Sequence, residues 1–263
     1  MRETLKAMGA RSGLPGGRLS ALVLGAWWLL FSIPAIVASF GPEGDGGHSA
    51  TSAGELASFA RSLLGGGVAG KRLAGMLAGA TLVLGAMQTA IAQFTTVALE
   101  EFHLQPGQLV SLVLLVQVVA LPGALAVGWL SERVGRGPAL ALALGGWTAV
   151  FVLGWFVTTT GQLWARAVLL ALVLGGAASV IRAAVAGIAP PGRSGATFGL
   201  LNVGAKLAGG VATLAFGAIY QVAGQPRAGL LALLLQLVLG WWLLARTGSA
   251  LDGPDERGTV ASA

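Results

Sequence analysis

Residues 108–130 read Gln-Leu-Val-Ser-Leu-Val-Leu-Leu-Val-Gln-Val-Val-Ala-Leu-Pro-Gly-Ala-Leu-Ala-Val-Gly-Trp-Leu, without a single charged side chain. A helix needs about 20 such residues to cross the hydrocarbon core of a bilayer. A strand of a membrane barrel would alternate polar and apolar residues, and this stretch does not. Since lipid offers no partner for an unpaired backbone group, the stretch predicts a transmembrane helix.

The rest of the chain has the same apolar character. Hydrophobic residues make up 55% of the 263 residues and charged residues 10%, whereas about 25% of an ordinary soluble protein is charged. So few charges could not cover the surface of a water-soluble fold. The sequence therefore predicts an all-α, polytopic helical membrane protein whose surroundings are the lipid bilayer. About seven transmembrane helices are expected, at 19–40, 73–99, 108–130, 138–157, 163–188, 197–222 and 228–245.

Glycine makes up 42 of the 263 residues, about twice its usual share. Pairs such as Gly175–Gly176 and Gly209–Gly210 suit a close approach of helices in lipid, where small residues line helix contacts. This pattern is common to helical membrane proteins and points to no particular function.

Several classes of function are disfavoured by composition. The net charge is +6, but the basic residues stand singly between apolar runs, so no nucleic-acid partner is expected. The sequence has no cysteine, which excludes disulfides, thiolate metal sites and cysteine catalysis. It also shows no paired carboxylates, metal-ligand cluster or nucleophile elbow. We therefore expect no enzyme activity, no cofactor and no metal site.

Residues 41–72 differ from the spans on either side, because they are rich in glycine and polar residues. Ser52 and Glu55 have the spacing of a helix capping box, and Gly65–Gly67 is a helix-ending run. The apolar residues between them recur at helical spacing, and they are Leu56, Phe59, Leu63 and Leu64. This segment predicts a cytoplasmic linker with an amphipathic helix on the membrane surface. The other segments are a basic N-terminal segment (1–18), a six-helix bundle (73–246) and a flexible cytoplasmic tail (247–263).

Lysines and arginines near the span ends predict the orientation in the membrane. They place the loops at 41–72, 131–137 and 189–196, together with the C-terminus, in the cytoplasm. Residues 1–18 disagree, because seven spans put them outside although they carry four basic residues and one acid. The conflict weakens if further spans precede Met1.

The loop between the third and fourth predicted spans reads Gly128-Trp-Leu-Ser-Glu-Arg-Val-Gly-Arg-Gly137. Gly128 would let two helices approach, and Gly135 would give a tight turn. Glu132 can form an ion cluster with Arg133 and Arg136 between neighbouring helices. Such a cluster would hold one conformation and break in another, which makes these residues a candidate conformational gate. A basic cytoplasmic loop with a glycine turn is the simpler alternative.

This loop closely resembles the G-x-L-(A/S)-D/E-R-x-G-R-(K/R) signature of the major facilitator superfamily of transporters. Other stretches look like its vacuole effluxer-like branch, which is named for fungal vacuolar amino-acid exporters. They are Trp27–Pro34, Leu115–Ala124, Arg182 with Pro190, and Phe198–Lys206.

The resemblance covers about residues 18–246 and aligns the seven spans with spans six to twelve of a twelve-span transporter. It implies a bacterial inner (plasma) membrane location and a central cytoplasmic linker at 41–71. It also implies that a missing N-terminal half, or a second copy of the chain, completes the transporter.

Substrate sites of such transporters lie near the bilayer midplane. Polar side chains near the middle of the predicted spans are Gln88, Gln117, Lys206 and Gln236. Asn202 lies one turn from Lys206, and Arg182 lies roughly 9 Å from the centre of its span. A charge at this depth costs at least about 2.5–3.5 kcal/mol, so Lys206 and Arg182 need partners or a water-filled cavity. The natural partner is an anionic group of the substrate, such as a carboxylate, or an acid from the missing half.

Simpler interpretations remain open for several of these residues. Arg182 could snorkel towards the cytoplasm or hold the cytoplasmic gate, and Gln88 and Gln117 could be hydrogen-bond links between helices. Gln236 is expected to serve packing. In the second span the chain reads Gly85-Ala86-Met87-Gln88-Thr89, where the branch usually has Asp-Gly before Val-Gln-Thr. Without an acid or histidine in any predicted span, this half offers no obvious proton carrier.

The sequence is therefore compatible with two functions. The first is a transporter that moves a small solute, such as an amino acid, by alternating access. The second is a non-transporting membrane subunit or a degenerate half-transporter. A seven-helix retinal photoreceptor is disfavoured, because Lys206 lies in the sixth span and no acidic counter-ion lies in the others.

Overall fold

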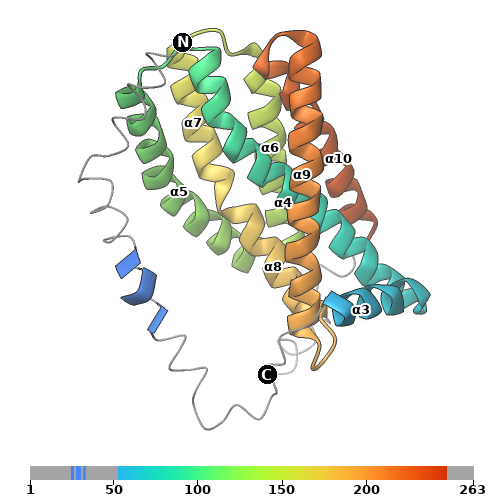
Figure 1. Ribbon diagram of the computed structural model, residues 1–263. Helices are drawn as coiled ribbons and strands as arrows, with labels where there is room; N and C mark the ends of the chain where they lie inside the picture. The colour runs from blue at the N-terminus through green and yellow to red at the C-terminus, as the bar shows by residue number, and fades with distance from the viewer. Residues whose placement is uncertain (1–24, 27, 31, 34–52, 248–263) are drawn as a thin grey trace. The chain divides into compact units, whose positions relative to one another are not determined.

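The computed structural model describes residues 53–247 and, before them, residues 25–26, 28–30, 32 and 33 (Figure 1). The chain divides into two units, 1–50 and 51–263, which are considered separately. In the first unit the described residues are helical, and the Ser32 hydroxyl donates to the Trp28 carbonyl at 2.7 Å. They lie within the span predicted at 19–40, which stays a prediction. The rest of that span, the segment 1–18 and the tail after Thr247 lie outside the described residues.

The described part of the second unit contains helices and turns and no strand. Its elements are α3 (Ala53–Gly65), α4 (Val68–Glu100), α5 (Pro106–Val134), α6 (Arg136–Phe156), α7 (Thr160–Leu174), α8 (Gly176–Ile188), α9 (Ser194–Ala223), the short 3-10 helix η1 (Pro226–Gly229) and α10 (Leu230–Arg246). Within these residues six segments are long and apolar enough to cross a membrane, with α7 and α8 forming one of them. The six spans predicted after residue 72 are confirmed.

Local sequence signals set the helix ends. Thr159 caps α7, because its hydroxyl accepts from the backbone N–H of Gln162 at 3.3 Å while the Gln162 amide oxygen accepts from the Thr159 N–H at 3.2 Å. Gly135 separates α5 from α6 with a φ of +91°, a conformation that L side chains avoid. The tight turn predicted at Gly135 is confirmed. The linker helix α3 ends at Gly65, as its glycine run predicts, whereas Ser52 of the predicted capping box lies outside the described residues.

The span predicted at 163–188 is broken into α7 and α8 at Gly175. There the two helices lie against α5. A Cβ atom on Gly175 would stand 2.8 Å from the Cβ of Ala124, and one on Gly176 would stand 2.5 Å from Val127. The absence of side chains therefore permits this contact, in agreement with the close approach expected at the glycine pair.

The central helix of the bundle is α4, which packs against α9, α10 and α3 (Figure 1). Of the 18-residue apolar stretch of α4, 61% is buried within the bundle, compared with 22% for the corresponding stretch of α5 and 17% for that of α9. The side chains that α5 and α9 leave exposed are largely apolar, and they include Leu114, Val118, Leu121, Leu125, Val203, Leu207, Val211 and Leu214. These two helices therefore present apolar faces to lipid or to another protein surface.

Helices α4 and α9 cross closely because Gly85 has no side chain at the contact. A Cβ on Gly85 would stand 2.7 Å from the backbone nitrogen of Gly209 and 2.8 Å from the Cβ of Ala208. Real Cβ atoms do not approach so closely, so a larger residue at Gly85 would push the helices apart. Gly210 differs, because nothing lies within 4 Å of its Cβ position.

We expect Gly85→Ala to destabilise the bundle by about 1–3 kcal/mol, as overpacked cores do. The matched control Gly210→Ala should be neutral or stabilising by up to about 1 kcal/mol, because alanine favours a helix interior and meets open space there. Unfolding of the purified protein in detergent micelles measures both. Equal destabilisation by the two variants would contradict the crossing described here.

Candidate functional site

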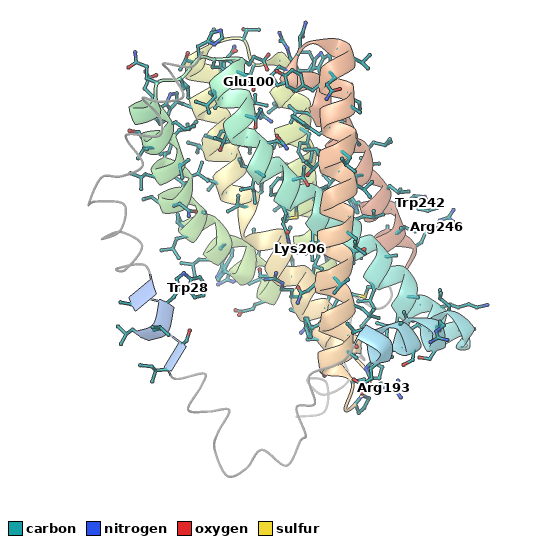
Figure 2. The ribbon with its side chains drawn as sticks, viewed as in Figure 1. Trp28, Glu100, Arg193, Lys206, Trp242 and Arg246 are labelled. Atoms are coloured by element: carbon teal, nitrogen blue, oxygen red, sulfur yellow. The ribbon has the colours of Figure 1, made fainter. Side chains whose placement is uncertain are left out.

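Two of the predicted site residues meet across the α4–α9 contact. Lys206 lies near the middle of α9, and its ammonium donates a hydrogen bond to the Gln88 amide oxygen of α4 at 3.3 Å. Lys206 is exposed and Gln88 is half-buried. Figure 2 shows Lys206 about half-way along the bundle. The structure thus places this charged side chain on the surface of the bundle, and its depth in the membrane stays a prediction from the sequence.

The same contact explains why the two side chains come together. The small residues at the Gly85–Gly209 crossing let the two backbones lie close, and the Thr89 hydroxyl donates to the Gly209 carbonyl at 3.0 Å. Because the backbones are close, the side chains of Lys206 and Gln88 are long enough to reach each other across the contact. Gln88 is therefore an interhelical link as well as a candidate ligand contact, so both interpretations of this residue are compatible with the structure.

Asn202 extends this polar group along α9. It is exposed and lies one turn before Lys206, on the same side of the helix. Among the residues that the structure describes, no acid lies within ion-pair distance of the Lys206 ammonium. Gln88, Asn202 and Lys206 together form the midplane cluster, a group with one positive charge and two side-chain amides.

The structure does not join Gln117 and Arg182 to this cluster. Both side chains are exposed, Gln117 on α5 and Arg182 on α8. The part of the chain described here shows no hydrogen bond or ion pair between either residue and Lys206. Their assignment to the substrate site stays a prediction from the sequence.

The candidate gate motif lies at the junction of α5 and α6. Arg133 stacks its guanidinium 4.2 Å from the centre of the Trp129 ring, and Glu132 is exposed. Arg136 lies beside α8, with Nη1 3.4 Å from the position that a Cβ on Gly187 would take. Over residues 53–247, Glu132 has no ion pair with either arginine. The expected ion cluster is thus not formed in this conformation, and its role as a gate stays a prediction.

Gly128 does not behave as expected within the described residues. Nothing lies within 4 Å of the position that its Cβ would take. The close approach of helices predicted at Gly128 is therefore not seen within the described residues, although the position is half-buried.

Sequence reasoning missed a charged group at the opposite end of the bundle from α3. Glu101, the residue after α4, forms an ion pair with Arg227 of η1 at 2.8 Å. Arg166 of α7 retains 6% of its accessible surface and donates through Nε to the Val150 carbonyl of α6 at 3.1 Å. The Glu101 carboxylate also interacts electrostatically with this guanidinium. We call Glu101, Arg166 and Arg227 the outer cluster.

The outer cluster connects α4, α7 and η1 through charge. Nothing local in the sequence marks Arg166 or Arg227 as part of a cluster, because each stands singly near a span boundary. The available signal was a pair of acids, Glu100 and Glu101, on the same side of the membrane as two arginines near span ends. Tyr220 of α9 also donates a hydrogen bond to Glu100, so both acids bind partners from other elements.

These features define a class: a polytopic helical membrane protein with a polar, positively charged group about half-way along its helical bundle. The chain belongs to the vacuole effluxer Atg22-like family, because the family model described as "Vacuole effluxer Atg22 like" matches residues 8–249. An "Uncharacterized MFS-type transporter YxiO" from Bacillus subtilis (strain 168) is 27% identical over 139 residues. That match covers 53% of this chain and 32% of the relative, about a third of the relative's length. The predicted resemblance to the vacuole effluxer-like branch is confirmed.

The exposure of Lys206 can be tested directly, because the sequence has no cysteine to react in the background. We expect Lys206→Cys to react in membranes with the charged methanethiosulfonate reagent MTSET, since that thiol would face water. Leu201→Cys on the same helix is the control and should stay unmodified, because Leu201 is fully buried. Labelling is read by mass spectrometry. Failure of the Lys206→Cys variant to react would mean that this side of α9 faces lipid.

The outer cluster predicts a stability effect. We expect Glu101→Gln to destabilise the bundle by about 1–3 kcal/mol, between the values for exposed and buried ion pairs. The reason is that Arg166 would keep its buried charge and lose the nearby carboxylate. Thermal unfolding in detergent measures the effect.

Glu132→Gln is the matched control for this experiment, because Glu132 is exposed and has no ion pair within residues 53–247. It should unfold like the wild-type protein. If the two variants unfold alike, the outer cluster contributes nothing to stability.

Proposed function

We propose that this chain forms half of a membrane transporter that binds a small solute with a carboxylate group at the midplane cluster. The observation that carries the proposal is Lys206, an exposed cation about half-way along the bundle with an amide partner at 3.3 Å. A charge at this depth costs at least about 2.5–3.5 kcal/mol when it faces lipid. A water-filled path and an anionic ligand remove that cost.

An α-amino acid fits this group chemically. Its carboxylate would interact with the Lys206 ammonium as a point charge. The side-chain oxygens of Gln88 and Asn202 could accept hydrogen bonds from the amino group of the ligand. The naming of the family after a vacuole effluxer is compatible with such a solute.

The proposal includes a second bundle of helices. The apolar faces of α5 and α9 suit a protein partner, and the match to the MFS-type relative covers about a third of that protein. Either an N-terminal half or a second copy of this chain could supply the partner. Alternating access would then rock one bundle against the other around the midplane cluster. We propose a bacterial inner membrane location, as the resemblance to the vacuole effluxer-like branch implies, with the C-terminus in the cytoplasm, as the distribution of basic residues predicts.

Coupling to protons is not part of the proposal. Among the described spans, the acids Glu100 and Glu132 lie in the last turns of α4 and α5 and not at the middle of the bundle. Coupling would have to come from the partner bundle, or the transport would be facilitative. The missing mid-membrane acid is also what supports the second candidate, a non-transporting subunit.

The test is uptake of radiolabelled L-amino acids into liposomes that contain the protein as its host expresses it. We expect Lys206→Ala to lower uptake at least tenfold, because the ligand carboxylate loses its positive partner. Lys206→Arg should retain part of the activity, since it keeps the charge.

Arg246→Gln is the control for this test, because it removes a cation that stacks on Trp242 at the end of α10. Its uptake should match that of the wild type. Unchanged uptake by Lys206→Ala would remove Lys206 from the site. If the wild-type protein takes up none of the amino acids, the non-transporting alternative gains support.

A further inference from the structure

A three-helix hydrogen-bond group lies directly beside the midplane cluster. Gln236 of α10 is half-buried, and its amide nitrogen donates to the Leu82 carbonyl of α4 at 3.1 Å and to the Ala208 carbonyl of α9 at 3.2 Å. One side chain thus bonds the backbones of two other helices. A residue that only filled space would need no such pair of bonds.

The bonds of Gln236 fall at the glycine crossing. Leu82 lies about one turn before Gly85 on α4, and Ala208 is the neighbour of Gly209 on α9. The Thr89 hydroxyl adds a further link between α4 and α9 through the Gly209 carbonyl. Glycine surfaces are smooth and do not by themselves fix how far one helix slides along the other. Directional bonds on both sides of the crossing do fix it.

The crossing controls the distance between Lys206 and Gln88. Lys206 lies two residues before Ala208, and Gln88 lies six residues after Leu82. A slide of α9 along α4 by one residue would move the Lys206 side chain by about 1.5 Å relative to Gln88. That shift is enough to break a hydrogen bond of 3.3 Å.

We propose that Gln236 is a positioning residue for the substrate site: it holds α4 and α9 in register, so that Lys206 and Gln88 meet a ligand in a fixed geometry. It acts through the helix backbones and does not touch the ligand. This inference rests on the proposed function. It replaces the sequence-based expectation that Gln236 serves packing alone.

A structural role and a positioning role make different predictions for transport. If Gln236 only stabilised the fold, its loss would lower the amount of folded protein and hence the maximal rate, and KM would stay the same. If Gln236 positions Lys206, its loss weakens ligand binding by each folded molecule. Hydrogen bonds between membrane helices have strengths that correspond to about a 3- to 20-fold effect on KM.

The experiment compares Gln236→Leu with the wild type in the liposome assay, using the amino acid that gives the highest uptake. We expect KM to rise about 3- to 20-fold, with kcat per folded transporter within twofold of the wild type. The matched control is Gln93→Leu, which removes an amide from α4 that forms no hydrogen bond within the described residues. An unchanged KM in Gln236→Leu overturns the proposal.

A second readout does not depend on transport. In a Lys206→Cys protein, the rate of reaction with MTSET reports the surroundings of position 206. Adding Gln236→Leu should change that rate, and adding Gln93→Leu should not. An unchanged rate overturns the positioning role even if transport fails for other reasons. A changed rate without any dependence of uptake on Lys206 supports the positioning role and overturns the proposed function.

If Gln236→Leu does not insert into membranes, Thr89→Val takes its place, because it removes the hydrogen bond from Thr89 of α4 to Gly209 of α9 while keeping the shape of the side chain. Its control is Thr213→Val. Thr213 donates to the same Gly209 carbonyl at 2.9 Å, but from within α9. We expect Thr89→Val to raise KM and Thr213→Val to leave it unchanged. Equal effects of the two variants would contradict the proposal.

Discussion

The contact between α4 and α9 at Gly85 and Gly209 is the constraint on which the rest of the described bundle depends. Helices in lipid gain little from hiding apolar side chains, since the lipid is equally apolar, and association depends on close packing and hydrogen bonds. Glycine brings the two backbones together here, and Thr89 and Gln236 supply directional bonds at the same place. The third helix of the group, α10, packs against both of the others.

The midplane cluster follows from this contact. Lys206 would be costly on a lipid-facing helix, and it is tolerable where two helices expose backbone and amide groups side by side. The exposed apolar faces of α5 and α9 have the opposite character. The described bundle therefore combines a positively charged polar group on α4 and α9 with apolar faces on α5 and α9.

The charged groups at the two ends of the bundle differ in whether they have ionic partners. The outer cluster is tied into the fold, since Glu101 pairs with Arg227 and interacts with the buried Arg166. At the opposite end, Glu132 of the gate motif is exposed and forms no ion pair within the described residues. A fixed ion group suits a structural role. A charge without a fixed partner suits contacts that form in another conformation or with another bundle.

The sequence by itself determined the number and approximate limits of the spans after residue 72, the turn at Gly135 and the family, because these follow from hydrophobic length, glycine conformation and a local motif. It also placed Lys206 near the middle of its helix, since position along a helix is proportional to residue number. The tertiary structure alone decided which polar residues meet. Gln88 joined Lys206, Gln117 and Arg182 did not, Gly128 met no neighbour, and Gln236 and Arg166 acquired partners from other helices. Such pairings depend on the rotation and crossing of helices, and these are set by contacts between residues far apart in the chain.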